Sequence, residues 1–381
     1  MDLPLTGIKV LELARVLAGP WMGQILAELG AEVIKVEAPE GDETRGWGPP
    51  FASDGAAAYF HCCNRGKRSI ALDFKNHDDL NIAKQLATNA DILIENFKVG
   101  GLAKFGLDYA ALARSNPALI YTSITGFGQT GPYAHRPGYD FIIQGMSGLM
   151  DLTGEPDGEP QKVGVAYADI FTAVYGVIAA QASLIQRCKS GKGQHIDMAL
   201  FDTQIGVLAN QATNYFWSGN SPRRIGNANP NIAPYQVFSA KDGPFIIACG
   251  NDAQFARLCG VLNLSLHHDP RFDTNANRVI HRTALTKAMS KPIKNRIRAD
   301  LLSALESAVV PAGSINTVAE AFADPQTLHR QLLREIDGGT YLANPIRMSA
   351  TDLAQNTRPP YLDEHGAAIR GALNAGTGWE K

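Results

Sequence analysis

Apolar runs and helix-type stretches alternate along the first half of the chain. Short apolar runs predict buried strands over residues 8–13, 32–37, 69–73, 91–95 and 119–125. The stretches between them predict helices over residues 19–29, 77–89 and 107–115. Strands that recur with intervening helices indicate an α/β fold with a parallel, doubly wound sheet covered on both faces.

The second half continues this pattern and then departs from it. Residues 169–189 form a long apolar stretch that predicts a helix, and a strand over residues 194–198 leads into a helix near Leu200. Asparagine, proline and glycine crowd residues 220–234, which is typical of a linker. Beyond the linker, apolar runs on both sides of Lys241-Asp242-Gly243 predict a β-hairpin.

The length of 381 residues exceeds the roughly 250–300 at which one hydrophobic core usually stops growing, so we expect two domains. The tail around Arg358-Pro359-Pro360 has too few apolar residues for a core of its own. We therefore expect a large domain, a linker, a small α+β domain and a return segment that packs on the large domain, over residues 1–215, 216–234, 235–325 and 326–381.

Charge and cysteine content narrow the range of partners. With 35 basic and 37 acidic residues the formal net charge is -2, which offers no overall footprint for nucleic acid or an anionic membrane. Five cysteines without C-x-x-C spacing argue against a disulfide framework and a thiolate zinc site. The N-terminus shows no secretory signal, and the apolar stretch 170–185 is short of the roughly 20 residues of a membrane span. We expect a cytoplasmic protein whose partners are small molecules or a second copy of the chain, with no nucleic acid and no membrane.

The common catalytic motifs are absent from the sequence. A dinucleotide site needs G-x-G-x-x-G at the first strand-to-helix turn, where residues 15–20 carry a single glycine, although Glu37 ends the second strand as a ribose-binding acid would. No P-loop, G-x-S-x-G or H-E-x-x-H segment occurs, and His267-His268 is read as a surface pair. Nicotinamide, serine-hydrolase and metal-dependent chemistry therefore lose support.

Glycine, asparagine and basic residues gather where the predicted strands end. They lie in residues 64–69, at Lys75, in residues 95–97 with Lys104, and in residues 126–132. Ligands of open α/β sheets bind at the carboxyl ends of strands, and basic residues there suit a phosphate-bearing ligand. Each residue alone is better explained as a solvated loop charge, and the set together indicates a site. Asp169 precedes the long apolar helix, so it is either a helix N-cap or a functional carboxylate.

Short motifs also follow one another in a fixed order along most of the chain. They are GIKVLELARVLAGP (7–20), LGAEVIKVE (29–37), GDETRGWGPPF (41–51), NRGKRSIALDFK (64–75), ENF (95–97), SITGFGQTGP (123–132), GYD (138–140), Asp169, GKGQHIDMAL (191–200), IAPYQVF (232–238) and VPAGSINTVAEAFADPQ (310–326). Their order and spacing resemble the class III CoA transferases, which include formyl-CoA transferase, carnitine CoA transferases and α-methylacyl-CoA racemase. The likeness is greatest to succinate–hydroxymethylglutarate CoA transferases, which move CoA between dicarboxylic acids.

This resemblance implies a Rossmann-like large domain built from both chain ends, a smaller domain, and a homodimer of two chains threaded through each other as interlinked rings. It implies an enzyme that moves CoA from an acyl-CoA, succinyl-CoA first of all, to a free dicarboxylic acid. Coenzyme A enters as the acyl-CoA substrate, and we expect no permanently bound cofactor and no metal.

Two other functions remain open beside this one. Acyl-CoA racemases resemble the chain but carry histidine where Tyr139 stands, and a neutral tyrosine is a poor base at pH 7, which weighs against racemisation. An acyl-CoA-binding protein without turnover is disfavoured because Asp169 is retained.

Site residues follow from the resemblance position by position. Asp169 matches the catalytic aspartate that attacks the thioester and then carries CoA as an aspartyl-CoA thioester, and a helix dipole there would favour its ionised form. Arg15 and Arg45 are the candidates for a substrate carboxylate, while Arg15 has the alternative of contacting a CoA phosphate or bracing its loop. The positions expected to contact CoA are Val16, Leu17, Ala18, Leu72, Lys75, Asn96, Phe97, Lys104, Pro137, Gly138, Tyr139 and Asp140.

The chain departs from formyl-CoA transferase at three places. That enzyme has glutamine where Leu17 stands and arginine where Ala38 stands, and residues 250–254 (Gly-Asn-Asp-Ala-Gln) occupy the region of its glycine-rich lid. How the reactive intermediate is shielded from water is therefore an open point of the sequence-based account.

Overall fold

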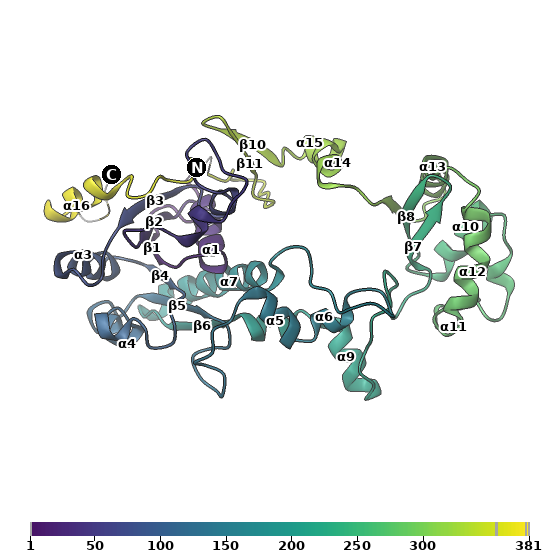
Figure 1. Ribbon diagram of the computed structural model, residues 1–381, viewed down its shortest axis with the longest axis horizontal. Coiled ribbons are helices and arrows are strands. Elements are labelled where there is room, and N and C mark those ends of the chain that lie inside the picture. The colour runs from purple at the N-terminus through teal and green to yellow at the C-terminus, as the bar shows by residue number, and fades with distance from the viewer. Residues whose placement is uncertain (1, 355–356, 378, 380–381) are drawn as a thin grey trace. The chain divides into compact units, whose positions relative to one another are not determined.

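A computed structural model describes residues 2–354, 357–377 and 379, and the chain divides into two compact units. The first unit comprises the residues up to Leu149, Lys162–Phe216 and the residues from Gln326 on, and the second comprises Met150–Gln161 and Trp217–Pro325. The chain thus leaves the first unit near residue 216 and rejoins it near residue 326 (Figure 1).

Six parallel strands form the sheet of the first unit, in the order β3-β2-β1-β4-β5-β6. They are β1 (Lys9–Leu13), β2 (Glu32–Glu37), β3 (Lys67–Ala71), β4 (Ile92–Glu95), β5 (Ile120–Thr125) and β6 (His195–Ala199). The predicted α/β fold with a parallel sheet is confirmed. The largest difference lies at β3, which begins at Lys67 because this lysine is buried on a carboxylate of β1, a position that apolarity does not mark.

Successive residues of each strand pack into two separate hydrophobic cores, because side chains alternate between the two faces of a sheet. Val10, Val33 and Ile94 pack under the helices α1 (Ala18–Glu28), α5 (Asp140–Met146), α7 (Tyr167–Ser190) and α8 (Leu200–Gly206). Leu11, Ile34 and Leu93 pack on the other face under α3 (His77–Thr88), α4 (Tyr109–Ser115) and α16 (Gly366–Asn374). Figure 1 shows α3, α4 and α16 on one side of the sheet and α1 and α7 on the other.

The long apolar helix α7 serves this core. Its residues Ala168, Ala173, Val177 and Ala180 are buried against α1 and the sheet. Within the described part of the chain it is also the one helix long and apolar enough to span a membrane, with a mean hydropathy of 1.5, a test that core helices of soluble proteins pass as well.

The second unit has a core of its own. The predicted hairpin forms as β7 (Tyr235–Ala240) and β8 (Gly243–Ala248), and β9 (Ala312–Ser314) extends it to an antiparallel sheet. Phe238, Phe245, Phe255 and Leu285 fill the space between this sheet and its helices. The helices around this core are α10 (Asp252–Val261), α11 (Asn275–Ile280), α12 (Arg282–Ile293) and α13 (Arg298–Ser307), and α14 (Val318–Ala323) follows β9 without buried residues.

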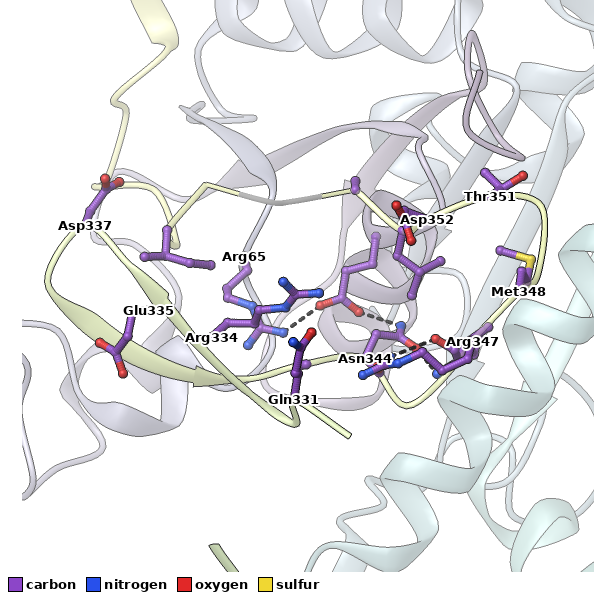
Figure 2. A pocket seen from close by; sticks show the side chains of 16 residues that line it. Arg65, Gln331, Arg334, Glu335, Asp337, Asn344, Arg347, Met348, Thr351 and Asp352 are labelled. Atoms are coloured by element: carbon purple, nitrogen blue, oxygen red, sulfur yellow. Dashed lines mark hydrogen bonds and ion pairs between the residues drawn. The ribbon is translucent and has the colours of Figure 1, made fainter. Parts of the chain in front are cut away.

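The segment from residue 326 onward is anchored on the first unit by side chains. It carries a hairpin, β10 (Leu333–Ile336) with β11 (Gly339–Leu342), that the sequence pattern does not predict. The Asn344 amide donates to one oxygen of the Glu28 carboxylate (2.6 Å), and Arg65 donates to the other (2.6 Å; Figure 2). Farther on, the Asp363 carboxylate accepts from the Ala71 N–H at the edge of the sheet (2.8 Å). The remaining short helices are α2 (Ala58–His61), α6 (Leu149–Leu152), α9 (Ala209–Ser218) and α15 (Pro325–His329).

Candidate active site

The strand order reverses between β1 and β4, and the loops that leave these strands diverge at the carboxyl edge of the sheet. Asn96, directly after β4, bridges the two loops. Its side-chain oxygen accepts from the Arg15 N–H (3.1 Å) and its amide nitrogen donates to the Arg15 carbonyl (2.7 Å). This is where ligands of open α/β sheets bind.

A cavity of about 190 Å³ opens at this point of the first unit. It brings together ten of the residues expected from the sequence, which lie far apart along the chain. They are Arg15, Val16, Leu17, Ala18, Asn96, Phe97, Pro137, Gly138, Tyr139 and Asp169. Gly126 and Gly138 face each other inside it so closely that a Cβ on Gly138 would lie 2.5 Å from the Gly126 Cα, so neither loop tolerates a side chain there.

Asp169 is the third residue of α7, and it is not the helix N-cap. The N-cap is Ala166, which has no side-chain oxygen, and the Asp140 carboxylate accepts from the Ala168 N–H instead (2.8 Å). The N-cap alternative for Asp169 is therefore wrong. Within the described part of the chain, its carboxylate has no hydrogen-bond donor, and it lines the cavity.

Burial and the neighbouring charge of Asp140 raise the pKa of Asp169 to about 7. The expected effect of the helix dipole, which favours the ionised form, is outweighed at this position. A dipole at a helix start contributes roughly 0.3–1 kcal/mol, whereas removing a carboxylate from water without a hydrogen bond costs several kcal/mol. The Asp169 carboxyl group therefore keeps its proton to a higher pH than an ordinary aspartate does.

Arg15 keeps its guanidinium in solvent at the mouth of the cavity. Its side chain is 63% exposed and pairs with Glu43 (Nη1 to Oε1, 3.2 Å), a residue that also lines the cavity. Because solvent-exposed ion pairs are weak, a substrate carboxylate can replace Glu43 at little cost. The structure therefore leaves Arg15 available to an anionic ligand.

Arg45 is not available, and its expected role toward a substrate carboxylate is not supported. Its Nε and Nη2 donate to the two oxygens of Glu37 (2.8 and 2.7 Å), and its guanidinium lies 3.7 Å from the centre of the Phe60 ring. Nη2 also donates to the Pro360 carbonyl (3.1 Å). A guanidinium with these partners holds the loop and the return segment together.

Four of the expected CoA-contacting residues lie outside the cavity. Leu72 is buried in the core, and Asp140 is bonded to α7 and Gln144. Lys75 and Lys104 are exposed, but they flank an aromatic group in which Phe74 stacks on Phe97 (6.4 Å between ring centroids) and meets Phe105 edge-on (5.5 Å). Since Phe97 lines the cavity, this group extends the site toward the two lysines.

The turn after β1 has a strained backbone that buried side chains hold in place. Val16 has a φ of 72°, a left-handed conformation that a β-branched residue adopts only under constraint. Its N–H is 3.3 Å from the Asp42 carboxylate, and the Lys35 ammonium donates to the Ala14 carbonyl (2.8 Å). Asp42 and Lys35 are themselves paired (2.9 Å) and buried. Sequence reasoning missed both residues, although Asp42 lies in the GDETRGWGPPF motif.

A buried charge network lies beneath this turn. Glu12 of β1 pairs with Lys35 (3.1 Å) and with Lys67 (2.8 Å), and all of these side chains are inaccessible to solvent. Burial opposes the charge on Lys35, but the Glu12 and Asp42 carboxylates outweigh it and raise its pKa, whereas burial lowers the pKa of Lys67. The network ties strands β1, β2 and β3 to one another and, through Lys35, to the turn after β1.

A larger cavity of about 630 Å³ lies elsewhere in the first unit, along the return segment (Figure 2). The residues that line it include Arg65, Arg334, Arg347 and Asp352. Arg65 is already paired with Glu28. Arg65 belongs to a segment that the sequence pattern singled out, but none of the expected catalytic, substrate-carboxylate or CoA-contacting residues lines this cavity. The chemistry therefore points to the smaller cavity at Asp169.

Comparisons with known proteins identify the family. The family described as CoA-transferase family III matches residues 5–366. The chain is 54% identical over 382 residues to a succinate–glutarate CoA-transferase of Agrobacterium fabrum, which covers 97% of this chain and 96% of that protein. It is 42% identical over 369 residues to the succinyl-CoA:glutarate CoA-transferase of Mus musculus, which covers 95% and 84%.

Among solved structures, a CAIB/BAIF family protein from Brucella suis is similar with a TM-score of 0.89 and 60% sequence identity, covering 98% of this chain and 100% of that one. Family match, relatives and solved structure extend over nearly the whole length of the sequence. The chain therefore belongs to CoA-transferase family III.

Proposed function

We propose that the protein transfers CoA from succinyl-CoA to a free dicarboxylic acid, with Asp169 as the covalent carrier. The observation that carries the proposal is the Asp169 carboxylate, which has no hydrogen-bond donor among the described residues and lines the cavity at the reversal of the sheet. Similarity to two succinate–glutarate CoA-transferases supports this choice of substrates.

The exchange proceeds in steps that balance without an oxidant or a metal. The Asp169 carboxylate attacks the thioester carbonyl of succinyl-CoA, the C–S bond breaks, and CoA leaves as the thiolate with a mixed anhydride on Asp169. The thiolate then attacks the Asp169 carbonyl, which releases succinate and leaves an aspartyl-CoA thioester. The acceptor acid attacks that thioester, and the same two steps in reverse order yield the new acyl-CoA and the free aspartate.

The environment of Asp169 suits this chemistry. A carboxylate whose pKa lies near 7 binds a proton more readily than an ordinary aspartate, and the same basicity makes it a better nucleophile. Because no donor in the part of the chain that the structure describes holds the carboxylate, no such hydrogen bond has to be broken when it attacks. Its partial burial limits the water that could hydrolyse an anhydride or thioester.

The direct test supplies succinyl-CoA and glutarate to the purified protein and follows glutaryl-CoA by chromatography. Running the reaction in D₂O separates the racemase alternative, since a racemase exchanges the α proton of its acyl-CoA and a transferase does not. We expect glutaryl-CoA to form with no deuterium at the α carbon. Deuterium uptake without a new CoA ester would favour the racemase.

Arg15 is expected to select dicarboxylic acids. A guanidinium binds a distal carboxylate through two parallel hydrogen bonds, and losing such a contact costs about 1.5–3 kcal/mol. We expect Arg15→Ala to lower kcat/KM for glutarate by roughly 10- to 150-fold, and to lower it much less for a monocarboxylic acid of equal chain length. Arg15→Lys, which keeps the charge but not the fork, should fall between. The control Arg114→Ala changes an exposed arginine on α4. An equal loss for both acids would show that Arg15 does not select the acceptor.

We also propose that the active protein is an interlinked homodimer. Large apolar side chains stand exposed on neighbouring helices of the first unit, among them Phe141 (58%) on α5 and Ile178 (56%) and Ile185 (65%) on α7. Contiguous exposed apolar surface usually marks an interaction site. Sedimentation at low concentration should give twice the chain mass of 40.9 kDa. An active monomer under the same conditions would contradict the dimer.

A further inference from the structure

Asp140 is tied to the helix that carries Asp169 and does not line the cavity. It is the first residue of α5. One carboxylate oxygen accepts from the Ala168 N–H (2.8 Å), and the other accepts from the Gln144 side-chain amide (2.7 Å). Ala168 immediately precedes Asp169, so Asp140 fixes the backbone from which the nucleophile projects.

Gln144 completes this connection from within the same helix. It is fully buried, and its side-chain oxygen accepts from the Val163 N–H (2.9 Å). Asp140 and Gln144 thus hold both ends of the segment that enters α7, residues 163–168. Since Ala166 offers no capping side chain, Asp140 supplies from α5 the acceptor that this helix start otherwise lacks.

The charge of Asp140 also acts on the nucleophile. Burial raises the pKa of Asp169, and the Asp140 charge raises it further. Burial, together with the Asp169 charge, raises the pKa of Tyr59 of α2. Other charged or titratable residues line the same cavity, among them Arg15, Glu43, Lys98, His135 and Arg136. A neutral side chain at position 140 would let Asp169 ionise at lower pH.

We propose that Asp140 is a positioning residue for Asp169, which fixes the first turn of α7 through Ala168 and sets the charge that the nucleophile faces. The inference rests on the proposed role of Asp169. It replaces the expectation that Asp140 contacts CoA.

The test compares Asp140→Asn with the double variant Asp140→Asn/Gln144→Glu. In the single variant the new amide can still accept from Ala168, but its nitrogen faces the Gln144 amide, so that two donors meet. In the double variant the amide introduced at position 140 donates to the carboxylate introduced at position 144, whose second oxygen still accepts from Val163. The exchange restores the bonds to Ala168 and Val163 and the one between positions 140 and 144, gives up the long bond from the Gln144 amide to the Val165 carbonyl (3.4 Å), and moves the charge by one helical turn. Asp202→Asn is the control, because Asp202 is an exposed acid in the first turn of α8.

For Asp140→Asn we expect kcat to fall by roughly 10- to 100-fold, because the nucleophile is misplaced. The KM for succinyl-CoA should change little. The acid limb of the kcat/KM profile should move to lower pH, since removing a like charge favours the ionised Asp169. The double variant should recover most of kcat, and Asp202→Asn should match the wild type.

Three results would overturn the proposal. A loss of thermal stability with the acid limb unmoved would make Asp140 purely structural, and a raised KM with unchanged kcat would make it a CoA contact. A double variant as impaired as the single one would exclude the hydrogen-bond role. If the proposed function itself were wrong, the wild-type protein would show no CoA adduct on Asp169 at all, which distinguishes this failure from the three results above.

Discussion

Replacing Asp169 by alanine is expected to reduce CoA transfer by about 10⁴-fold or more, since removal of a covalent nucleophile closes the pathway. Glu43, the other carboxylate among the described residues that line the cavity, is 38% exposed beside Arg15 and lacks the buried setting of Asp169. Calorimetric titration with CoA should show binding within a few-fold of the wild type, because the loop residues around the cavity remain. Near-wild-type turnover by the alanine variant would contradict the covalent mechanism.

The isosteric variant Asp169→Asn separates loss of chemistry from loss of structure. A carboxyl whose pKa is raised in the folded state destabilises the fold once its unfolded form ionises, near pH 4, and this cost grows until the pH passes the folded value of about 7. The asparagine variant should therefore melt at a higher temperature than the wild type at pH 8, with a much smaller difference at pH 4. A lower melting temperature at pH 8 would show that the carboxylate stabilises the fold.

The second large effect is on stability. Glu12 lies between Lys35 and Lys67 with no access to solvent, so Glu12→Gln leaves two buried ammonium groups without their shared carboxylate. Breaking a buried pair in this way costs about 3–5 kcal/mol. Asp42 still neutralises Lys35, whereas among the described residues Lys67 keeps only the Asn64 side chain and the Pro20 carbonyl as hydrogen-bond partners.

Hydrogen exchange of the β1–β3 amides is the suitable measurement, because it reports on the first unit alone. Their opening free energy should fall by the stated amount in Glu12→Gln. Glu40→Gln, at an exposed position between β2 and the cavity loop, should stay within about 0.5 kcal/mol of the wild type. A loss below about 1 kcal/mol in Glu12→Gln would show that the network contributes little to stability.

Apolar patterning predicts the sheet well, because parallel strands covered on both faces are continuous apolar runs. The strand 32–37 forms with the predicted bounds, whereas β3 starts earlier at Lys67. The reason is physical: Lys67 and Lys35 are buried because each meets Glu12, and a pattern that assigns charges to the surface cannot show this. The hairpin β10–β11 escapes prediction because its strands are short and largely exposed.

The site follows from the motifs only in part. Their order identifies Asp169 and the loops that meet around it, but it does not show which partner each side chain binds or whether the side chain faces the cavity. Arg45 lies in a matched motif and is nevertheless bound to Glu37, and Asp140 faces α7 rather than the cavity. These outcomes depend on which partners the fold brings to each side chain, Glu37 to Arg45 and the Ala168 N–H to Asp140, and an apolar pattern does not contain this information.

The central claim is that Asp169 carries CoA covalently. Protein mixed with succinyl-CoA, quenched in acid and digested with pepsin should yield a peptide containing Asp169 whose mass is increased by CoA less one water. Addition of glutarate before the quench should remove this adduct and release glutaryl-CoA. Turnover of succinyl-CoA and glutarate with Asp169 unmodified throughout, or with CoA attached to another residue instead, would contradict the account.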